Sequence, residues 1–109
     1  MAITVNIRYT GQNRNARYFA EEMKSGGTVD AIRAEDGNLR FEYYISMDDP
    51  ETVLLIDSWV DQQAIDSHHA SPMMRTITEL REKYDLHMTV ERFVSDENGA
   101  SGDDKYVRK

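Results

Sequence analysis

Alternating hydrophobic and polar residues predict that three segments of the chain are strands with one buried face. In residues 3 to 9 an apolar side chain occupies every second position: Ile3, Val5, Ile7 and Tyr9. This is the two-residue period of a half-buried strand, and it recurs in residues 39 to 47 and 86 to 94. Residues 52 to 60, TVLLIDSWV, are apolar almost throughout, as in a strand covered on both faces.

The segments between these strands have helical periodicity. From about Asn13 to Lys24, apolar side chains fall at i, i+3, i+4 and i+7: Ala16, Phe19, Ala20 and Met23. Residues 25 to 27, SGG, interrupt this helix, and Thr28 can cap a short continuation. The pattern predicts two consecutive helices between the first and second strands.

The second helical region is also divided. Asp61 can cap a helix that begins near Gln62. Pro72 cannot take an interior helical position without losing a backbone hydrogen bond, so this helix must end before it. Ser71 as N-cap and Pro72 as the first helical residue would then start a new helix.

The resulting element order, β-α-β-β-α-β, is that of an α+β ferredoxin-like sandwich. A chain of 109 residues is the size of one domain. We expect this domain to span residues 1 to 94. We expect residues 95 to 109 to be a polar tail that is flexible or packs on a partner subunit.

In this fold the helices cover one face of an antiparallel sheet and leave the other face open. The alternation assigns a mixture of polar and apolar side chains to the open face, among them Asn6, Arg8, Tyr44 and His87. Such a face suits a sheet-to-sheet homodimer that encloses a cavity better than it suits open water.

Charge and composition narrow the classes of partner. No Lys or Arg lies between Arg40 and Arg75, whereas this sector contains Glu42, Asp48, Asp49, Glu51, Asp57, Asp61 and Asp66, which account for the net charge of -7. An acidic field of this kind repels phosphates and disfavours nucleic acid. The chain has no Cys, which excludes disulfides and thiolate catalysis. Without a signal segment or a long apolar run, we expect a cytoplasmic protein with no membrane partner.

Residues 53 to 74, VLLIDSWVDQQAIDSHHASPMM, resemble the antibiotic biosynthesis monooxygenase domain, a family that includes quinol monooxygenase-like proteins. The most specific part is the spacing of Trp59, Ala64, Ile65, His68, Ser71 and Pro72. The resemblance implies a dimeric α+β barrel, in which two ferredoxin-like subunits pack sheet to sheet. It also implies a pocket, either between the sheet and its helices or inside the barrel.

The family's activities differ, so the residues must discriminate among them. The heme-degrading branch has an Asn on the first strand, which Asn6 could match. The positions of its pocket Trp and iron-ligating His are occupied here by His68 and Thr78, which disfavours heme. A branch that isomerises a phosphorylated compound is disfavoured by the acidic sector, although Arg8 keeps it open.

His68 occupies the family's helix His position and is the candidate catalytic residue. An imidazole titrates near neutral pH, so it could remove a phenolic proton. Held protonated by neighbouring acids, it could instead stabilise a phenolate, and a purely structural role at the helix end is a third possibility. Neighbouring helix residues point about 100° apart, so His68 and His69 cannot both face one pocket, and His69 is expected to face solvent. A metal site is not expected from two adjacent imidazoles.

Trp59 could stack on an aromatic ligand or serve as a core residue at a strand end. Asn6, Arg8, Tyr44 and His87 could hydrogen-bond a quinone oxygen or balance an enolate, or they could be ordinary interface polarity. The resulting hypothesis is a homodimeric monooxygenase for a small aromatic or hydroquinone-type substrate, with no flavin, heme or metal cofactor. The alternative is a dimeric barrel of the stress-response or ligand-binding kind that holds a small molecule without catalysis.

Overall fold

The computed structural model describes residues 1–97 and 102–109. The strands are β1 (Ile3–Thr10), β2 (Asn38–Ile45), β3 (Thr52–Trp59) and β4 (His87–Val94). The helices are α1 (Asn15–Ser25), α2 (Thr28–Arg33), α3 (Gln62–His69) and α4 (Met73–Lys83), and a 3-10 helix, η2, spans Asp104–Tyr106.

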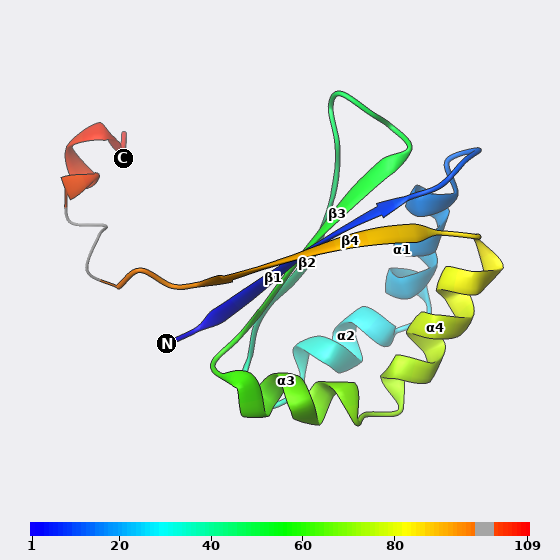
Figure 1. The fold of residues 1–109 in the computed structure, drawn as a ribbon, viewed down its shortest axis with the longest axis horizontal. Helices are drawn as coiled ribbons and strands as arrows, with labels where there is room; N and C mark the ends of the chain where they lie inside the picture. The colour runs from blue at the N-terminus through cyan, green and yellow to red at the C-terminus, as the bar shows by residue number, and fades with distance from the viewer. Residues whose placement is uncertain (98–101) are drawn as a thin grey trace.

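The four strands form one antiparallel sheet in the order β2-β3-β1-β4, and α1 to α4 all lie on the same side of it (Figure 1). The predicted α+β ferredoxin-like fold is therefore confirmed. Both helical connections are divided in two, as the SGG segment and Pro72 indicate.

Local interactions explain most of the helix boundaries. Gly27, with φ of 84°, takes the left-handed conformation between α1 and α2. The side chain of Asp61 accepts a hydrogen bond from Ala64 N at 2.9 Å and caps α3 as predicted. The predicted cap at Ser71 is wrong. Pro72 precedes α4 directly, and the Ser71 hydroxyl is buried without a hydrogen-bond partner among the described residues.

The hydrophobic core fills the space between the sheet and the four helices. Its fully buried members are Trp59, Phe19, Phe41, Met23, Ile32, Val29 and Val53. Phe19 and Met23 come from the α1 face that the helical spacing predicted. Burying several large side chains between the layers contributes on the order of 1.5–3 kcal/mol for each of them.

The strand register decides which side chains face this core. Val5 pairs with Asp57, and Phe41 also pairs with Asp57, so all three share the helix-covered face. β3 was expected to be covered on both faces, but helices cover only one of them in the single chain. Leu54 and Ile56 lie on the open face and are half-buried there.

A register shift between Asn38 and Arg40 changes one further expectation. Leu39 was expected beside Phe41 on the apolar face, but it is 56% exposed because the irregularity removes it from the alternation.

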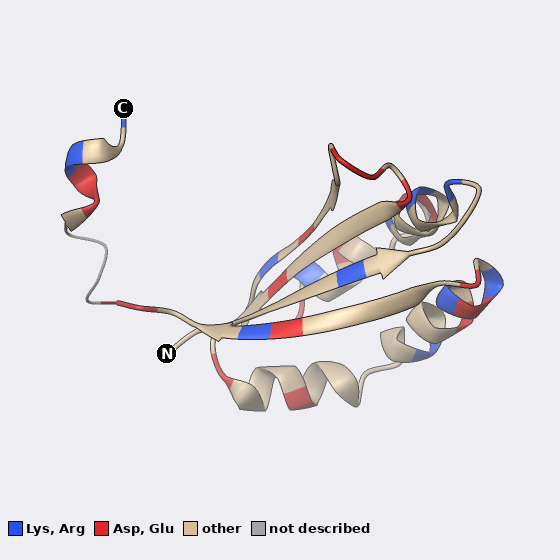
Figure 2. Ribbon diagram, turned by 45° about the horizontal axis from the view of Figure 1, so that its top comes forward, with Lys and Arg blue, Asp and Glu red and all other residues tan. Residues whose placement is uncertain are grey.

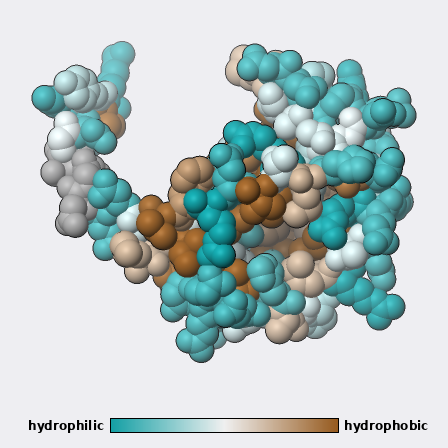
Figure 3. Space-filling model, viewed as in Figure 1, coloured by the Kyte–Doolittle hydropathy of each residue, from teal (hydrophilic) through white to brown (hydrophobic). Residues whose placement is uncertain are grey.

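The distribution of charged residues in the fold reflects the acidic sector of the sequence between Arg40 and Arg75. Acidic residues lie on the turn between β2 and β3, and α3 contains Asp66 but no Lys or Arg (Figure 2). Hydrophobic residues gather over the strands in the middle of the view in Figure 3, with hydrophilic residues around them.

β4 ends at Val94, and Ser95 N still donates to Ala2 O at 3.0 Å. The boundary after residue 94 and the flexible or subunit-packing tail stay predictions; residues 98–101 lie outside the described part of the chain. Of the helices in residues 1–97 and 102–109, none is long and apolar enough to cross a membrane.

We predict that Gly37→Ala destabilises the protein more than Gly27→Ala, although both residues have φ of 84°. At Gly37 a Cβ atom would lie 2.7 Å from Ala64 Cβ and 2.9 Å from Val60 Cγ2, whereas at Gly27 it would meet nothing within 4 Å. The free energy of unfolding should fall by about 1–2 kcal/mol in both variants, because alanine disfavours the left-handed conformation. Gly37→Ala should lose about 1–3 kcal/mol more from overpacking. Urea unfolding of both variants measures the difference, and equal losses would contradict the predicted contact with α3.

Candidate functional site

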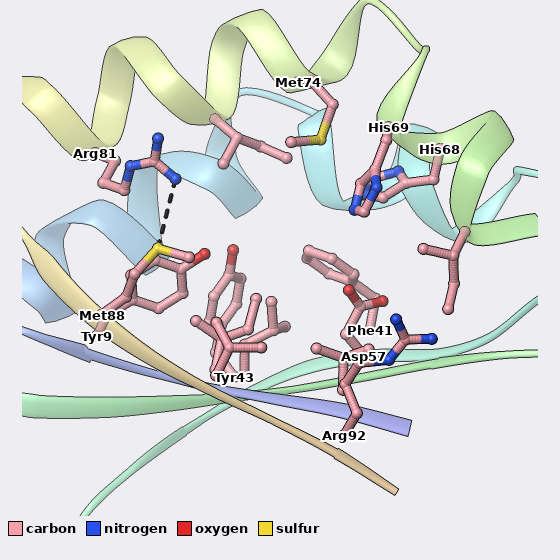
Figure 4. A pocket seen from close by; sticks show the side chains of 16 residues that line it. Tyr9, Phe41, Tyr43, Asp57, His68, His69, Met74, Arg81, Met88 and Arg92 are labelled. Atoms are coloured by element: carbon pink, nitrogen blue, oxygen red, sulfur yellow. Dashed lines mark hydrogen bonds between the residues drawn. The ribbon is translucent and has the colours of Figure 1, made fainter. Parts of the chain in front are cut away.

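A cavity of about 300 Å³ lies between the sheet and helices α3 and α4. Its wall is mainly apolar and includes Val5, Ile7, Phe41, Leu55, Ile65, Met74, Ile77, Met88 and Val90. The polar groups that border it are Tyr9, Tyr43, Asp57, His68, His69, Arg81 and Arg92 (Figure 4). Its volume is at the lower end of the roughly 300–1,000 Å³ of small-molecule pockets.

Asp57 is a carboxylic acid on the floor of this cavity. It lies on the core face of β3 and is only 7% exposed. Burial raises its pKa from 3.8 to about 7, and the negative charge of Glu35 acts in the same direction. A hydrogen bond of 2.5 Å from Trp59 Nε1 to Asp57 Oδ1 partly opposes the shift. A carboxyl group that titrates near neutral pH beside an apolar cavity can exchange protons with a bound ligand.

His68 borders the same cavity from the end of α3 and is 4% exposed. Its Nδ1 lies 3.0 Å from Oε2 of Glu35, which follows α2. Because an ionised carboxylate can only accept, this contact places a proton on Nδ1 and leaves Nε2 of the neutral ring as an acceptor. The fold thus brings together two residues that are 33 positions apart.

Trp59 connects the two ionisable groups. Its indole stacks on the His68 ring with centroids 4.8 Å apart and donates its N–H to Asp57. Trp59 is fully buried and does not border the cavity. In this structure Trp59 supports Asp57 and His68, which do border the cavity, and its stacking partner is the His68 ring.

Two phenol hydroxyl groups also point into the cavity (Figure 4). Tyr43 Oη is buried and has no hydrogen-bond partner among the described residues. Burial is the main cause of the raised pKa of both tyrosines, to about 12 for Tyr9 and well above its ordinary value for Tyr43. Both hydroxyls therefore stay protonated and can donate to a ligand.

The other predicted ligand-binding residues lie on the opposite face of the sheet. Register pairs Asn6 with Glu91 and Arg8 with Thr89, and His87 and Tyr44 share that face. Their grouping on one face is the predicted one, but the sheet separates them from the cavity that His68 borders. A direct role for them would need a second ligand site on the open face.

Neighbouring side chains already engage two of these residues. Arg8 Nη1 donates to Glu91 Oε1 at 2.6 Å, and Tyr44 donates to Glu42 and accepts from Arg40. Asn6 Oδ1, in contrast, is buried without a partner among the described residues.

His69 corrects an expectation about the histidine pair. Although it is exposed, His69 borders the same cavity as His68, and their ring centroids lie 5.8 Å apart. The exposure of His69 agrees with the expectation, but the expectation that only one of the two could face a pocket is wrong, because both border this one. In the described residues no group of three His, Asp or Glu is arranged to hold a metal ion.

Three residues of this site were not among the candidates expected from the sequence: Asp57, Glu35 and Tyr43. Asp57 had one signal, since it is the only charged residue in the otherwise apolar run of β3. Tyr43 was one of two adjacent tyrosines of which only one could face a cavity. Glu35 had no signal, because nothing in a turn sequence shows which helix its side chain will approach.

Comparison with known proteins identifies the family. Residues 2–80 match the model of the antibiotic biosynthesis monooxygenase family, and the chain therefore belongs to this family. No curated protein matches the chain.

Several solved structures share the fold at low sequence identity. SnoaB of Streptomyces nogalater, a cofactor-independent oxygenase whose structure is that of a point mutant, has a TM-score of 0.73 and 16% identity over 90% of this chain and 96% of its own. A conserved protein of Methanosarcina mazei has a TM-score of 0.76 and 20% identity, covering 88% and 94%. A Deinococcus radiodurans protein assigned to the antibiotic biosynthesis monooxygenases has a TM-score of 0.70 and 18% identity, covering 89% and 94%.

We predict that Asp57→Asn stabilises the protein increasingly as pH rises from 5 to 8. Unfolded Asp57 loses its proton near pH 4 and folded Asp57 near pH 7, so the wild type loses stability across this interval. At about 1.4 kcal/mol per pKa unit, the gain of the variant over wild type should grow by about 2–3 kcal/mol. The amide oxygen can still accept from Trp59.

Urea unfolding at pH 5 and pH 8 measures this difference. Asp66→Asn is the matched control, because Asp66 is an exposed carboxylate on α3 whose removal should give no comparable pH dependence. A gain for Asp57→Asn that is the same at both pH values would contradict the raised pKa.

Proposed function

We propose that this protein is a monooxygenase that acts on a small phenolic or hydroquinone-type compound without a flavin, heme or metal cofactor. The observation that carries this proposal is the pair of proton acceptors, Asp57 and His68, at one small and otherwise apolar cavity. Membership of the antibiotic biosynthesis monooxygenase family and the similarity to SnoaB, a cofactor-independent oxygenase, support it.

The first step is deprotonation of a phenol hydroxyl by His68 Nε2. Glu35, which accepts from Nδ1, stabilises the imidazolium that forms. The phenolate then transfers one electron to O₂, and the resulting radical and superoxide combine through a C–O bond. The proton on His68 passes to the peroxide, so this step yields a neutral hydroperoxide and restores the imidazole.

Asp57 acts in the second half of the reaction. Its carboxylate removes the hydrogen from the oxygenated ring carbon, the O–O bond breaks, and the proton joins the departing hydroxide to form water. A dihydroxybenzene and O₂ thus yield a hydroxyquinone and water, which balances all atoms. The apolar wall strengthens these electrostatic interactions by excluding water from the charged intermediates.

We further propose that two copies pair through their open sheet faces. The open face exposes Phe93 by 51% and Tyr44 by 37%, which is a considerable apolar surface for a monomer. In such a homodimer Asn6, Arg8, Tyr44 and His87 would lie at or near the interface, where the partner could supply an acceptor for the Arg8 guanidinium or a donor for Asn6 Oδ1.

We predict that wild-type protein accelerates oxygen uptake by hydroquinones, and that His68→Ala and Asp57→Asn each lower the rate by about 10²–10⁴-fold, the typical contribution of general acid–base catalysis. The measurement is oxygen consumption corrected for autoxidation, with ¹⁸O₂ to test for one labelled oxygen in the product. Asp66→Asn is the control for the carboxylate, because it changes an exposed acid outside the cavity.

Equal rates for wild type, His68→Ala and Asp57→Asn would remove both residues from the mechanism. Binding of a hydroquinone by the wild type with no turnover would instead favour the ligand-binding alternative. A shifted Soret band on titration with hemin would support the heme-binding alternative.

We predict that the protein sediments as a dimer at micromolar concentration. Phe93→Glu would place a negative charge on the open face of each copy, and the repulsion between the two charges should shift the protein toward monomer. The variant should therefore sediment more slowly than wild type. Thr76→Glu is the control, because it adds the same charge at an exposed position of α4, away from the open face. Wild-type protein that remains a monomer under these conditions would contradict the sheet-to-sheet pairing.

A further inference from the structure

The cavity has two chemically different ends (Figure 4). Asp57 and His68, which can accept protons, lie at one end with His69 and Arg92. Arg81 and Met88 lie at the other end, next to the hydroxyl group of Tyr9, and Tyr43 lies between the two ends. Apolar side chains form the wall between these groups.

Arg81 has donors that the protein leaves unused. The only hydrogen bond of its side chain among the described residues runs from Nη1 to the thioether sulfur of Met88, at 3.5 Å. A thioether is a weak acceptor, and a guanidinium has five N–H donors. On the exposed side of the same helix, in contrast, Arg75 has a carboxylate partner, Glu79, at 3.0 Å.

Tyr43 supplies a second unused donor at the same cavity. Its hydroxyl is buried and unpartnered among the described residues, and leaving such a group unsatisfied costs about 1–3 kcal/mol. Native proteins rarely retain this cost without a reason. A ligand oxygen in the cavity would accept from Tyr43 and would lie toward the guanidinium of Arg81.

We infer that Arg81 and Tyr43, with Tyr9 beside them, form a subsite for the carboxylate of an aromatic hydroxy acid whose phenol hydroxyl lies toward Asp57 and His68. Arginine is well suited to this group, because its planar donors match the two oxygens of a carboxylate. This inference names the substrate class of the proposed monooxygenase and rests on that function for its catalytic meaning. The binding preference itself does not require turnover.

The subsite also gives the ligand a direction. A neutral hydroquinone could enter the cavity in either orientation, because its two hydroxyls are equivalent. A carboxylate held at the Arg81 end turns the hydroxyl toward the proton acceptors. In the reversed orientation it would meet the Asp57 carboxylate, and Arg92, the guanidinium at that end, already donates to Gln62 Oε1. The acidic sector of the chain does not prevent this, because Arg81 lies outside it.

The test compares 2,5-dihydroxybenzoate with 2,5-dihydroxybenzamide, which differ in one substituent, an anionic carboxylate in the first and a neutral amide in the second. Binding is measured without oxygen, by calorimetry and by the fluorescence of Trp59, the only Trp of the chain. Wild-type protein should bind the acid at least tenfold more tightly than the amide. Arg81→Met should reduce this ratio to about one and leave the affinity for the amide within about twofold.

Two further variants make the result specific. Tyr43→Phe removes a hydroxyl that has no partner among the described residues, so the fold should tolerate it, and both ligands should bind several-fold more weakly. Arg75→Met, on the exposed side of α4, should leave the acid-to-amide ratio unchanged.

Equal binding of acid and amide by the wild type would overturn the inference, as would an equal loss of both ligands in Arg81→Met. Oxygen-uptake assays keep this outcome separate from the proposed function. Preference for the acid without turnover would retain the subsite and reject the monooxygenase, whereas turnover of hydroquinones without the preference would do the reverse.

Discussion

The register of β3 is the constraint on which the candidate site depends. Its pairing with β1 and β2 places Asp57 and Trp59 on the helix-covered face, where Asp57 lies opposite Val5 and Phe41. Side chains alternate between faces, so a slip of one residue would turn the carboxyl and the indole away from the core. Val53 and Leu55, both buried, oppose such a slip because it would expose them.

Burying Asp57 links stability to the proposed chemistry. Desolvation disfavours the ionised carboxylate and thereby raises its pKa to about 7, which lowers the stability of the fold at neutral pH. The bond from Trp59 offsets part of this cost and fixes the direction of the carboxyl group. A residue that weakens the fold yet sits at an apolar cavity is typical of functional sites, where stability and activity conflict.

The division of the helices shapes the other half of the site. Because Pro72 ends the first helical segment early, His68 lies at the end of α3, within reach of both the cavity and Glu35. α4 then starts in a new direction and carries Arg81 toward the far end of the cavity. The helix break at Pro72 therefore places His68 at one end of the cavity and Arg81 at the other.

Hydrophobic periodicity and helix-breaking residues by themselves determined the element order, the fold class, the two-part helices and the set of residues on the open face. These are properties of neighbours along the chain, and a single sequence contains them in full. His68 could also be selected as a candidate from the sequence, because its spacing from Trp59 resembles that of the family.

Only the tertiary structure decided which face carries the cavity, and it placed Asn6, Arg8, Tyr44 and His87 on the other one. It also brought Glu35 to His68 and left Tyr43 and Arg81 without strong acceptors among the described residues. These outcomes depend on strand register and on contacts between distant segments. Burial, which gives Asp57 its raised pKa, is likewise a property of the packed molecule and has no counterpart in the order of residues.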